Sequence, residues 1–484
     1  MKERKPSLKL NAVLNSINAV MSVLFPLITY PYVTRVLFAD NLGKVNFASS
    51  IIGYFALIAG LGIAAYAARE GVQYRHDRKQ LTQFCSEIFT LNIITTLASL
   101  LLLAGCCIFM PRFQSYAFLL AIYSLTIVFS TIGMPWLYTL EEDYLYITTK
   151  AIMIQAVTVV LMFVFVRDKD DYYKYALLNV LTTVGTNALN LFYCRRYIDM
   201  KVTFQFKKVF SHLKACLVFF SSSIASSIYS NIDTTMLGFF ATDFYVGIYG
   251  VAVKIYVMIK LVLSAFTSVM TPRLTSFVAN GEKEEFNNLI STTFKLLWTF
   301  LLPVVLGLIL VSNEVIWLIS GPGYEGAVSA LQILSFAIFF AMFATVINGS
   351  ILIPNKQEKN ALKTTVAAAV VNAVLNLVAI PLFLQNGAAA TTVVAECVVM
   401  VMGWLYARKL VKLQSMKKTI LTSLLGCVAI VAVCLLVQLL PINMTLRLLL
   451  KMGISVVAYA AVLFATGNEL ARQTMQAVIK KIKK

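Results

Sequence analysis

The sequence has few charged side chains for its length. Asp, Glu, Lys and Arg make up 13% of the 484 residues, whereas a soluble domain carries about a quarter. Hydrophobic residues make up 59%, and the mean hydropathy is +0.80. A soluble globular protein is therefore excluded, because a surface with so few charges would not stay hydrated.

Residues that carry metal or nucleophilic chemistry are also scarce. The two histidines, His76 and His212, lie in basic segments, and no nucleophile is paired with a base. The eight cysteines show neither zinc nor redox spacing. The acidic groups at 168–171 and 141–143 fall in predicted loops, where solvation explains them. The sequence predicts no enzyme, no metal site and no cofactor.

Long apolar runs recur along the whole chain, each about as long as the ~20 residues that cross a bilayer core. We predict an all-α polytopic membrane protein with about fourteen transmembrane helices. Because the first run shows no cleavage site, we expect it to be a permanent helix and not a signal peptide. The predicted helices lie at about 10–33, 45–68, 88–110, 115–138, 148–166, 174–194, 217–241, 247–271, 291–311, 328–352, 362–384, 387–407, 419–440 and 446–466.

The net charge of +19 has a distribution that predicts the orientation. With an even number of helices and both termini in the cytoplasm, most of the 41 Lys and Arg residues fall in the inner segments. They would face anionic lipid headgroups, so no nucleic-acid partner is needed. The longest predicted outer loop is 312–327, and no loop is long enough for a soluble domain.

Two short segments weakly resemble segments later in the chain, which suggests an internal duplication. The segment around Gly43 resembles that around Gly247, 204 residues later, and the segment around Glu142 resembles that around Glu358, 216 residues later. Each copy would hold six helices, so the copies would be parallel bundles with a cavity between them. The predicted domains are 1–205, 206–412 and a third part, 413–484, with two further helices and a basic cytoplasmic tail.

An ordered series of short motifs resembles one transporter family. The motifs begin at residues 31, 53, 136, 231, 246, 272, 320, 348 and 372, and read PYVTRVL, GYFALIAGLG, WLYTLEEDY, NIDTTMLG, VGIYGVA, PRL, SGPGYE, NGSILIP and NAVLNL. Over about residues 10–410 the chain is similar to the Wzx-like oligosaccharide flippases. These are polysaccharide transporters of the multidrug/oligosaccharidyl-lipid/polysaccharide exporter superfamily. One departure is Phe38-Ala39, where relatives often carry Gly-Pro.

The resemblance implies a V-shaped pair of bundles in a bacterial cytoplasmic membrane. The implied activity is alternating-access flipping of a polyprenyl-diphosphate-linked glycan, for capsule or exopolysaccharide assembly, from the inner to the outer leaflet. Membrane lipids, a polysaccharide polymerase and glycosyltransferases are the implied partners. The alternatives are a lipid II flippase, a cation-coupled multidrug exporter of the same superfamily, and a membrane glycosyltransferase or polymerase.

Ionisable residues within predicted helices are costly in lipid and are candidates for function. Asp233 and Lys254 fall at similar depths on neighbouring helices. We predict that they pair, either to hold two helices together or to open as a lock or ion-coupling site. Glu396 lies in an apolar run with no evident partner. It is either a neutral acid bonded to a neighbouring helix or the carrier of a coupling proton.

Basic residues are candidates for contact with the diphosphate, because a dianion needs counter-charge. Lys260 lies on a different helix face from Lys254 and either snorkels to an interface or faces the cavity. Arg35, Arg69 and Arg273 either anchor helix ends or lie on the substrate pathway.

The predicted helix 217–241 is rich in small polar residues. Ser226, Ser230 and Asn231 lie in its middle part. They either form hydrogen bonds to neighbouring helices or line a route for sugars.

Overall fold

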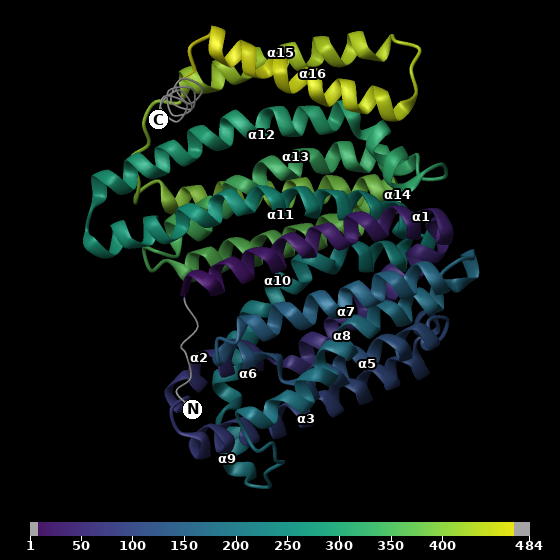
Figure 1. The fold of residues 1–484 in the computed structure, drawn as a ribbon, viewed down its shortest axis with the longest axis vertical. Helices are drawn as coiled ribbons and strands as arrows, with labels where there is room; N and C mark the ends of the chain where they lie inside the picture. Colours follow the sequence, from purple (N-terminus) through teal and green to yellow (C-terminus); the bar gives the residue numbers. More distant parts are fainter. Residues whose placement is uncertain (1–7, 469–484) are drawn as a thin grey trace. The chain divides into compact units, whose positions relative to one another are not determined.

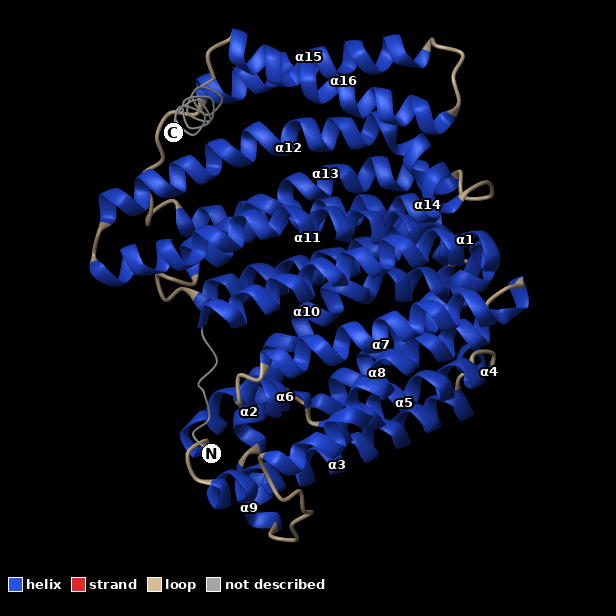
Figure 2. Ribbon diagram, in the orientation of Figure 1, coloured by secondary structure: helices blue, strands red, loops and turns tan. Residues whose placement is uncertain are grey.

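The computed structural model describes residues 8–468, and within this range every regular element is helical (Figure 2). Helices satisfy their own backbone hydrogen bonds, which lipid cannot do for them. Nine of the described helices are long and apolar enough to cross a membrane. The number is ten if the bent pair 206–221 and 223–240 is one span. An all-α, multi-pass membrane protein is confirmed.

The chain divides into two compact units, residues 1–247 and 248–484 (Figure 1). The first contains α1 (Leu8–Gly60), α2 (Ile63–Glu70), η1 (Gly71–Tyr74), α3 (Arg78–Phe109), α4 (Pro111–Gln114), α5 (Ala117–Gly133), α6 (Pro135–Leu140), α7 (Tyr144–Phe165), η2 (Lys169–Asp171), α8 (Tyr172–Tyr193), η3 (Cys194–Arg196), α9 (Phe206–Ser211) and α10 (Leu213–Phe240). Helix α11 (Asp243–Asn280) begins in this unit and continues into the next.

The second unit adds α12 (Lys283–Ser320), α13 (Gly326–Val346), the π-helical η4 (Ile347–Leu352), α14 (Glu358–Ala407), α15 (Lys417–Gln438) and α16 (Met444–Ala465). The predicted boundary near residue 206 concerns a duplication, and it stays a prediction. The predicted basic tail beyond residue 468 lies outside the described residues.

Each unit is held together by its own helix contacts. In the first, α1 packs against α3, α5, α7 and α10, and α5 packs against α8. In the second, α13 packs between α12 and α14, while α15 and α16 pack against each other and against α12. Many large apolar side chains elsewhere on these helices are exposed, for example Leu101, Val218 and Leu436. Such faces are those that lipid would cover.

Two of the longest helices bend sharply at a residue with positive φ. The first, α1, bends at Phe38, with φ 57° and ψ 173°. The second, α14, bends at Leu384, with φ 52° and ψ −130°. These backbone angles suit glycine much better than a residue with a Cβ atom. The bend at Phe38 falls where the family pattern often has glycine, so the departure noted in the sequence has a structural cost.

Beside the α1 bend, two glycines form a reciprocal close contact. A Cβ atom on Gly43 would overlap the backbone carbonyl of Asp243, and one on Gly247 would overlap the carbonyl of Ala39. Ala39 and Asp243 are 204 residues apart, as are Gly43 and Gly247. Gly43 therefore meets Asp243 in the same way as Gly247 meets Ala39, which is the same contact with the first and second segments exchanged. Only glycine allows two helix backbones to approach so closely.

Several helix ends differ from the prediction. The predicted helix 45–68 is interrupted near Gly62, where φ is 71°, and the predicted helix 115–138 is divided at Met134, where φ is 41°. The predicted outer loop 312–327 is wrong over most of its length, because α12 continues to Ser320. Glu314, which falls within the predicted loop, is buried on this helix and paired with Lys451.

Candidate functional site

A group of three polar side chains joins α11 to the second half of α14. Lys260 Nζ lies 2.7 Å from Glu396 Oε1, and the Tyr256 hydroxyl donates to the same oxygen at 2.8 Å. Lys260 also donates to the Tyr256 oxygen at 3.3 Å. Tyr256 and Lys260 are four residues apart on α11, so they share one face of that helix. We call these three residues the Lys260 group.

The members of the Lys260 group differ in exposure. The Lys260 side chain is 31% exposed, whereas that of Glu396 is 5% exposed. The carboxylate is therefore held inside the second unit, while the lysine side chain is partly exposed. An ion pair with a partly exposed cation can exchange its partner for an anionic ligand more easily than a fully enclosed pair.

The structure thus connects two residues that the sequence treated separately. The prediction that Glu396 has no evident partner is wrong, because Lys260 and Tyr256 both contact it. Periodicity could not find this pair, since the two residues are 136 positions apart in the chain. Whether Lys260 meets substrate and whether Glu396 couples ions stay predictions.

The polar residues of α10 lie partly on its exposed side. Ser226 and Ser230 are exposed, and Asn231 is half-buried. Ser230 donates to the Ser226 carbonyl at 2.9 Å, and the Asn231 amide donates to the Ser227 carbonyl at 3.1 Å. These donors are satisfied within their own helix, so their oxygens remain available as acceptors for a ligand or water.

The other predicted residues lie outside the Lys260 group. Arg35 is exposed on α1 just before the bend, and Arg69 is exposed in the last turn of α2. Arg273 is exposed on the far part of α11. Asp233, which is buried, belongs to the first unit, and Lys254 belongs to the second, so their pairing stays a prediction.

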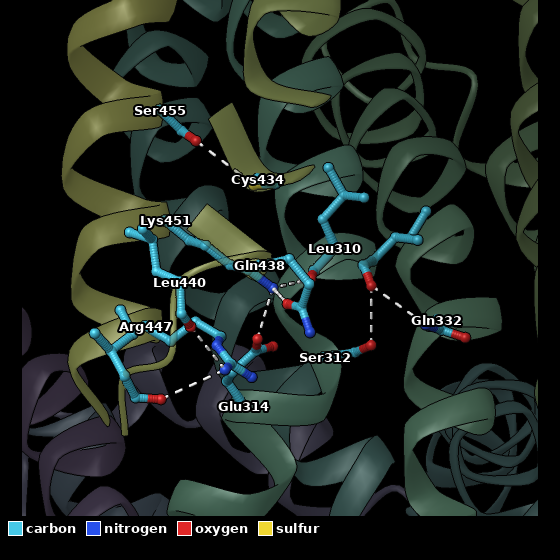
Figure 3. Close-up of polar contacts among 12 residues, drawn as sticks. Leu310, Ser312, Glu314, Gln332, Cys434, Gln438, Leu440, Arg447, Lys451 and Ser455 are labelled. Carbon is cyan, nitrogen blue, oxygen red and sulfur yellow. Dashed lines mark hydrogen bonds and ion pairs between the residues drawn. The ribbon is translucent and has the colours of Figure 1, made fainter. Parts of the chain in front are cut away.

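Sequence reasoning missed a buried ion pair between α12 and α16 (Figure 3). Lys451 Nζ lies 2.6 Å from Glu314 Oε1 and 2.6 Å from Gln438 Oε1 on α15. It also donates to the Leu310 carbonyl at 3.4 Å. The side chains of Lys451 and Glu314 are 5% and 2% exposed. The signal in the sequence was a single acidic residue, Glu314, and a single basic residue, Lys451, each next to an apolar run. The pair was missed because Glu314 fell in a predicted loop and Lys451 was counted with the outer charges.

A second missed residue is Lys150, which was counted with the inner charges but is buried on α7. Its ammonium group donates to the Asn190 side chain. It also lies 4.8 Å from the centre of the Tyr138 ring and 4.6 Å from that of Tyr146. Aromatic faces attract a cation, so these rings stabilise a charge that would otherwise be costly inside the bundle.

The two acidic groups considered for metal binding have structural roles. Arg75 pairs with Glu141 and Glu142, and Asp143 caps α7 and accepts from two tyrosine hydroxyls. In the group at 168–171, Asp171 accepts from Lys174 and from two backbone amides. The hydrogen bond from Lys174 and those from the backbone lower the pKa of Asp171 to about 2.

Comparison with known proteins identifies the family. The family model described as "Polysaccharide biosynthesis protein" matches residues 8–278, which is more than half of the chain. The chain belongs to this family. A relative from Escherichia coli (strain K12), named "Putative O-antigen transporter", is 25% identical over 402 residues, which cover 82% of this chain and 96% of that protein.

Solved structures share the fold at low sequence identity. One is the lipid II flippase MurJ in an inward closed conformation, with a TM-score of 0.75 and 15% identity over 96% of this chain and all of that one. Another is an inward-facing multidrug resistance MATE family transporter of the MOP superfamily. Its TM-score is 0.62, with 19% identity over 82% of this chain and 97% of that one. This member of the polysaccharide biosynthesis family thus has the MOP fold, and the proteins that it resembles are transporters and not enzymes.

Proposed function

We propose that this protein is a flippase that moves a polyprenyl-diphosphate-linked oligosaccharide from the inner to the outer leaflet of a bacterial cytoplasmic membrane. Membership of the polysaccharide biosynthesis family and the likeness to an O-antigen transporter support this substrate class. The observation that carries the proposal is the partly exposed side chain of Lys260, whose ammonium group is anchored on a buried carboxylate. A diphosphate needs such a cation inside the membrane.

Helix lengths support fourteen crossings within this proposal. At ~1.5 Å per residue, the 53 residues of α1 and the 50 of α14 would each be about two and a half times as long as the ~30 Å bilayer core. We propose that each crosses the membrane twice, turning at its bend. With α3, α5, α7, α8, α10–α13, α15 and α16 as single crossings, both termini lie on the same side of the membrane, which we propose is the cytoplasm.

The contact between glycines supports the duplication that the sequence suggested. An internal two-fold axis requires that position i of one copy meets position j of the other, and that j of the first meets i of the second. Gly43 with Asp243 and Gly247 with Ala39 have this relation. The bend of α1 at Phe38 also corresponds to the break between α10 and α11, 204 residues on. Two six-helix copies and alternating access belong to the proposal.

The serine face of α10 supports a polar route for sugars. Ser226 and Ser230 are exposed on a segment that is otherwise apolar enough to span a membrane, and the Ser230 hydroxyl already donates within the helix. Accessible hydroxyl oxygens of this kind can accept hydrogen bonds from glycan hydroxyls. We propose that Arg69 and Arg273, both exposed, meet the diphosphate before it reaches Lys260.

The test is flipping in proteoliposomes, with a fluorescent prenyl-diphosphate oligosaccharide and with lipid II in parallel. We expect Lys260→Ala to reduce flipping of the oligosaccharide lipid by tenfold or more, since hydrogen bonds to charged groups contribute ~1.5–3 kcal/mol. Lys283→Ala, at an exposed site in the first turn of α12, is the control. Preference for lipid II would favour the alternative substrate. Undiminished flipping by a variant lacking Lys260, Arg69 and Arg273 would refute the role of these charges.

A further inference from the structure

The Lys260 cation already has an anionic partner in this structure. Glu396 Oε1, at 2.7 Å, occupies a position that a phosphate oxygen would need. The glutamate is buried and is held a second time by the Tyr256 hydroxyl at 2.8 Å. A ligand that takes this position on Lys260 must therefore compete with a fixed carboxylate of the protein.

This competition bears on selectivity, because the surrounding membrane is rich in anionic lipids. A phospholipid headgroup such as that of phosphatidylglycerol carries one negative charge. If it replaced the carboxylate on Lys260, one singly charged partner would be exchanged for another, with little electrostatic gain. A glycan-linked diphosphate carries two negative charges, so its attraction to the same cation is greater.

We propose that Glu396 is a specificity-determining residue, which keeps monoanionic phospholipid headgroups off Lys260 and lets a dianionic diphosphate displace it. This inference rests on the proposed function and adds the basis of headgroup discrimination. Without the carboxylate, Lys260 would bind any anionic headgroup that reached it, and common phospholipids would occupy the site.

The geometry also explains why the carboxylate can act repeatedly. When a diphosphate takes Lys260, the hydroxyl of Tyr256 remains as a donor to Glu396, so the carboxylate keeps one hydrogen bond. The glutamate stays in place on α14 and can recapture Lys260 when the substrate leaves. Tyr256 is thus a positioning residue, since it acts through Glu396.

The experiment measures binding of a short-chain prenyl-diphosphate-linked N-acetylglucosamine to the full-length protein in lipid nanodiscs. The discs contain either phosphatidylcholine alone or increasing fractions of phosphatidylglycerol. In phosphatidylcholine we expect Glu396→Gln to bind the probe about tenfold more tightly than the wild type, because the internal competitor has lost its charge. Added phosphatidylglycerol should weaken binding to Glu396→Gln by a similar factor and leave the wild type almost unchanged.

Three further variants and one further measurement make the outcome decisive. Glu396→Asp should keep the wild-type response to phosphatidylglycerol. Tyr256→Phe should shift this response part of the way towards that of Glu396→Gln. Glu285→Gln, at an exposed site on α12, is the control and should leave the response unchanged. Phosphatidylglycerol retained by each purified variant is measured without any probe, and we expect more on Glu396→Gln than on the wild type.

Equal responses to phosphatidylglycerol in Glu396→Gln and the wild type, in both measurements, would overturn the inference. If Glu396→Gln retains more phosphatidylglycerol but neither protein binds the probe, the selectivity role of Glu396 is supported and the proposed substrate is wrong.

Discussion

The Lys451–Glu314 pair allows the most direct calculation from this structure. Both side chains are almost completely buried, and Glu314 Oε2 has no hydrogen-bond partner among the described residues. Lys451→Met removes the ammonium group and leaves the carboxylate with no counter-charge. Breaking a buried pair in this way costs about 3–5 kcal/mol, because an uncompensated charge remains. We expect Lys451→Met to lower the free energy of unfolding by about that amount.

The double variant separates pairing from packing. Glu314→Gln together with Lys451→Met leaves no charge at the site, so we expect it to cost only about 1 kcal/mol, as replacements of whole buried pairs often do. The coupling energy from the four proteins should then be 2 kcal/mol or more. Ordinary hydrogen bonds between membrane helices average about 0.6 kcal/mol and rarely exceed about 1.7. A buried ion pair therefore predicts a larger coupling energy than an ordinary hydrogen bond between helices.

The assay is reversible unfolding in mixed detergent micelles, followed by circular dichroism, for the wild type, both single variants and the double variant. Glu285→Gln, an exposed acid on the same helix, is the control and should stay within about 0.5 kcal/mol of the wild type. A double variant whose loss equals the sum of the two single losses would show that the residues do not stabilise each other. The reasoning from burial would then be refuted.

Three other outcomes follow from the backbone and from the loop that contains Asp171. Phe38→Gly should raise the free energy of unfolding by about 1 kcal/mol, since it relieves a positive φ at a side chain that is 53% exposed. Gly43→Ala should lower the unfolding midpoint because its Cβ atom would overlap backbone, whereas Gly53→Ala, with open space around it, should be neutral or stabilising. The pKa of Asp171 is lowered to about 2, so its contribution to the free energy of unfolding is full above about pH 4 and is lost as the pH falls towards 2. In thermal melts at a series of pH values, Asp171→Asn should therefore lose less stability than the wild type between about pH 4 and pH 2.

The class of this protein followed from its sequence because one physical requirement repeats along the whole chain. Every crossing must be apolar over about twenty residues, and that requirement leaves a local signal at each helix. The ordered motifs from residue 31 to residue 372 added the family. The glycines at 43 and 247 could be matched by offset, although their mutual contact could not be seen before the fold was known.

The partners of the buried charges were decided only by the tertiary structure. Lys260 and Glu396, or Lys451 and Glu314, lie more than a hundred residues apart, and no periodicity relates one to the other. In the sequence, a single charged residue in an apolar run gives the same pattern in three different cases. It can lie at the end of a helix, face a substrate pathway or pair with an opposite charge. The sequence by itself determined where the chain meets lipid, because lipid acts on each segment separately. The packing of helices decided which charges meet, because that energy exists only when two distant segments are brought together.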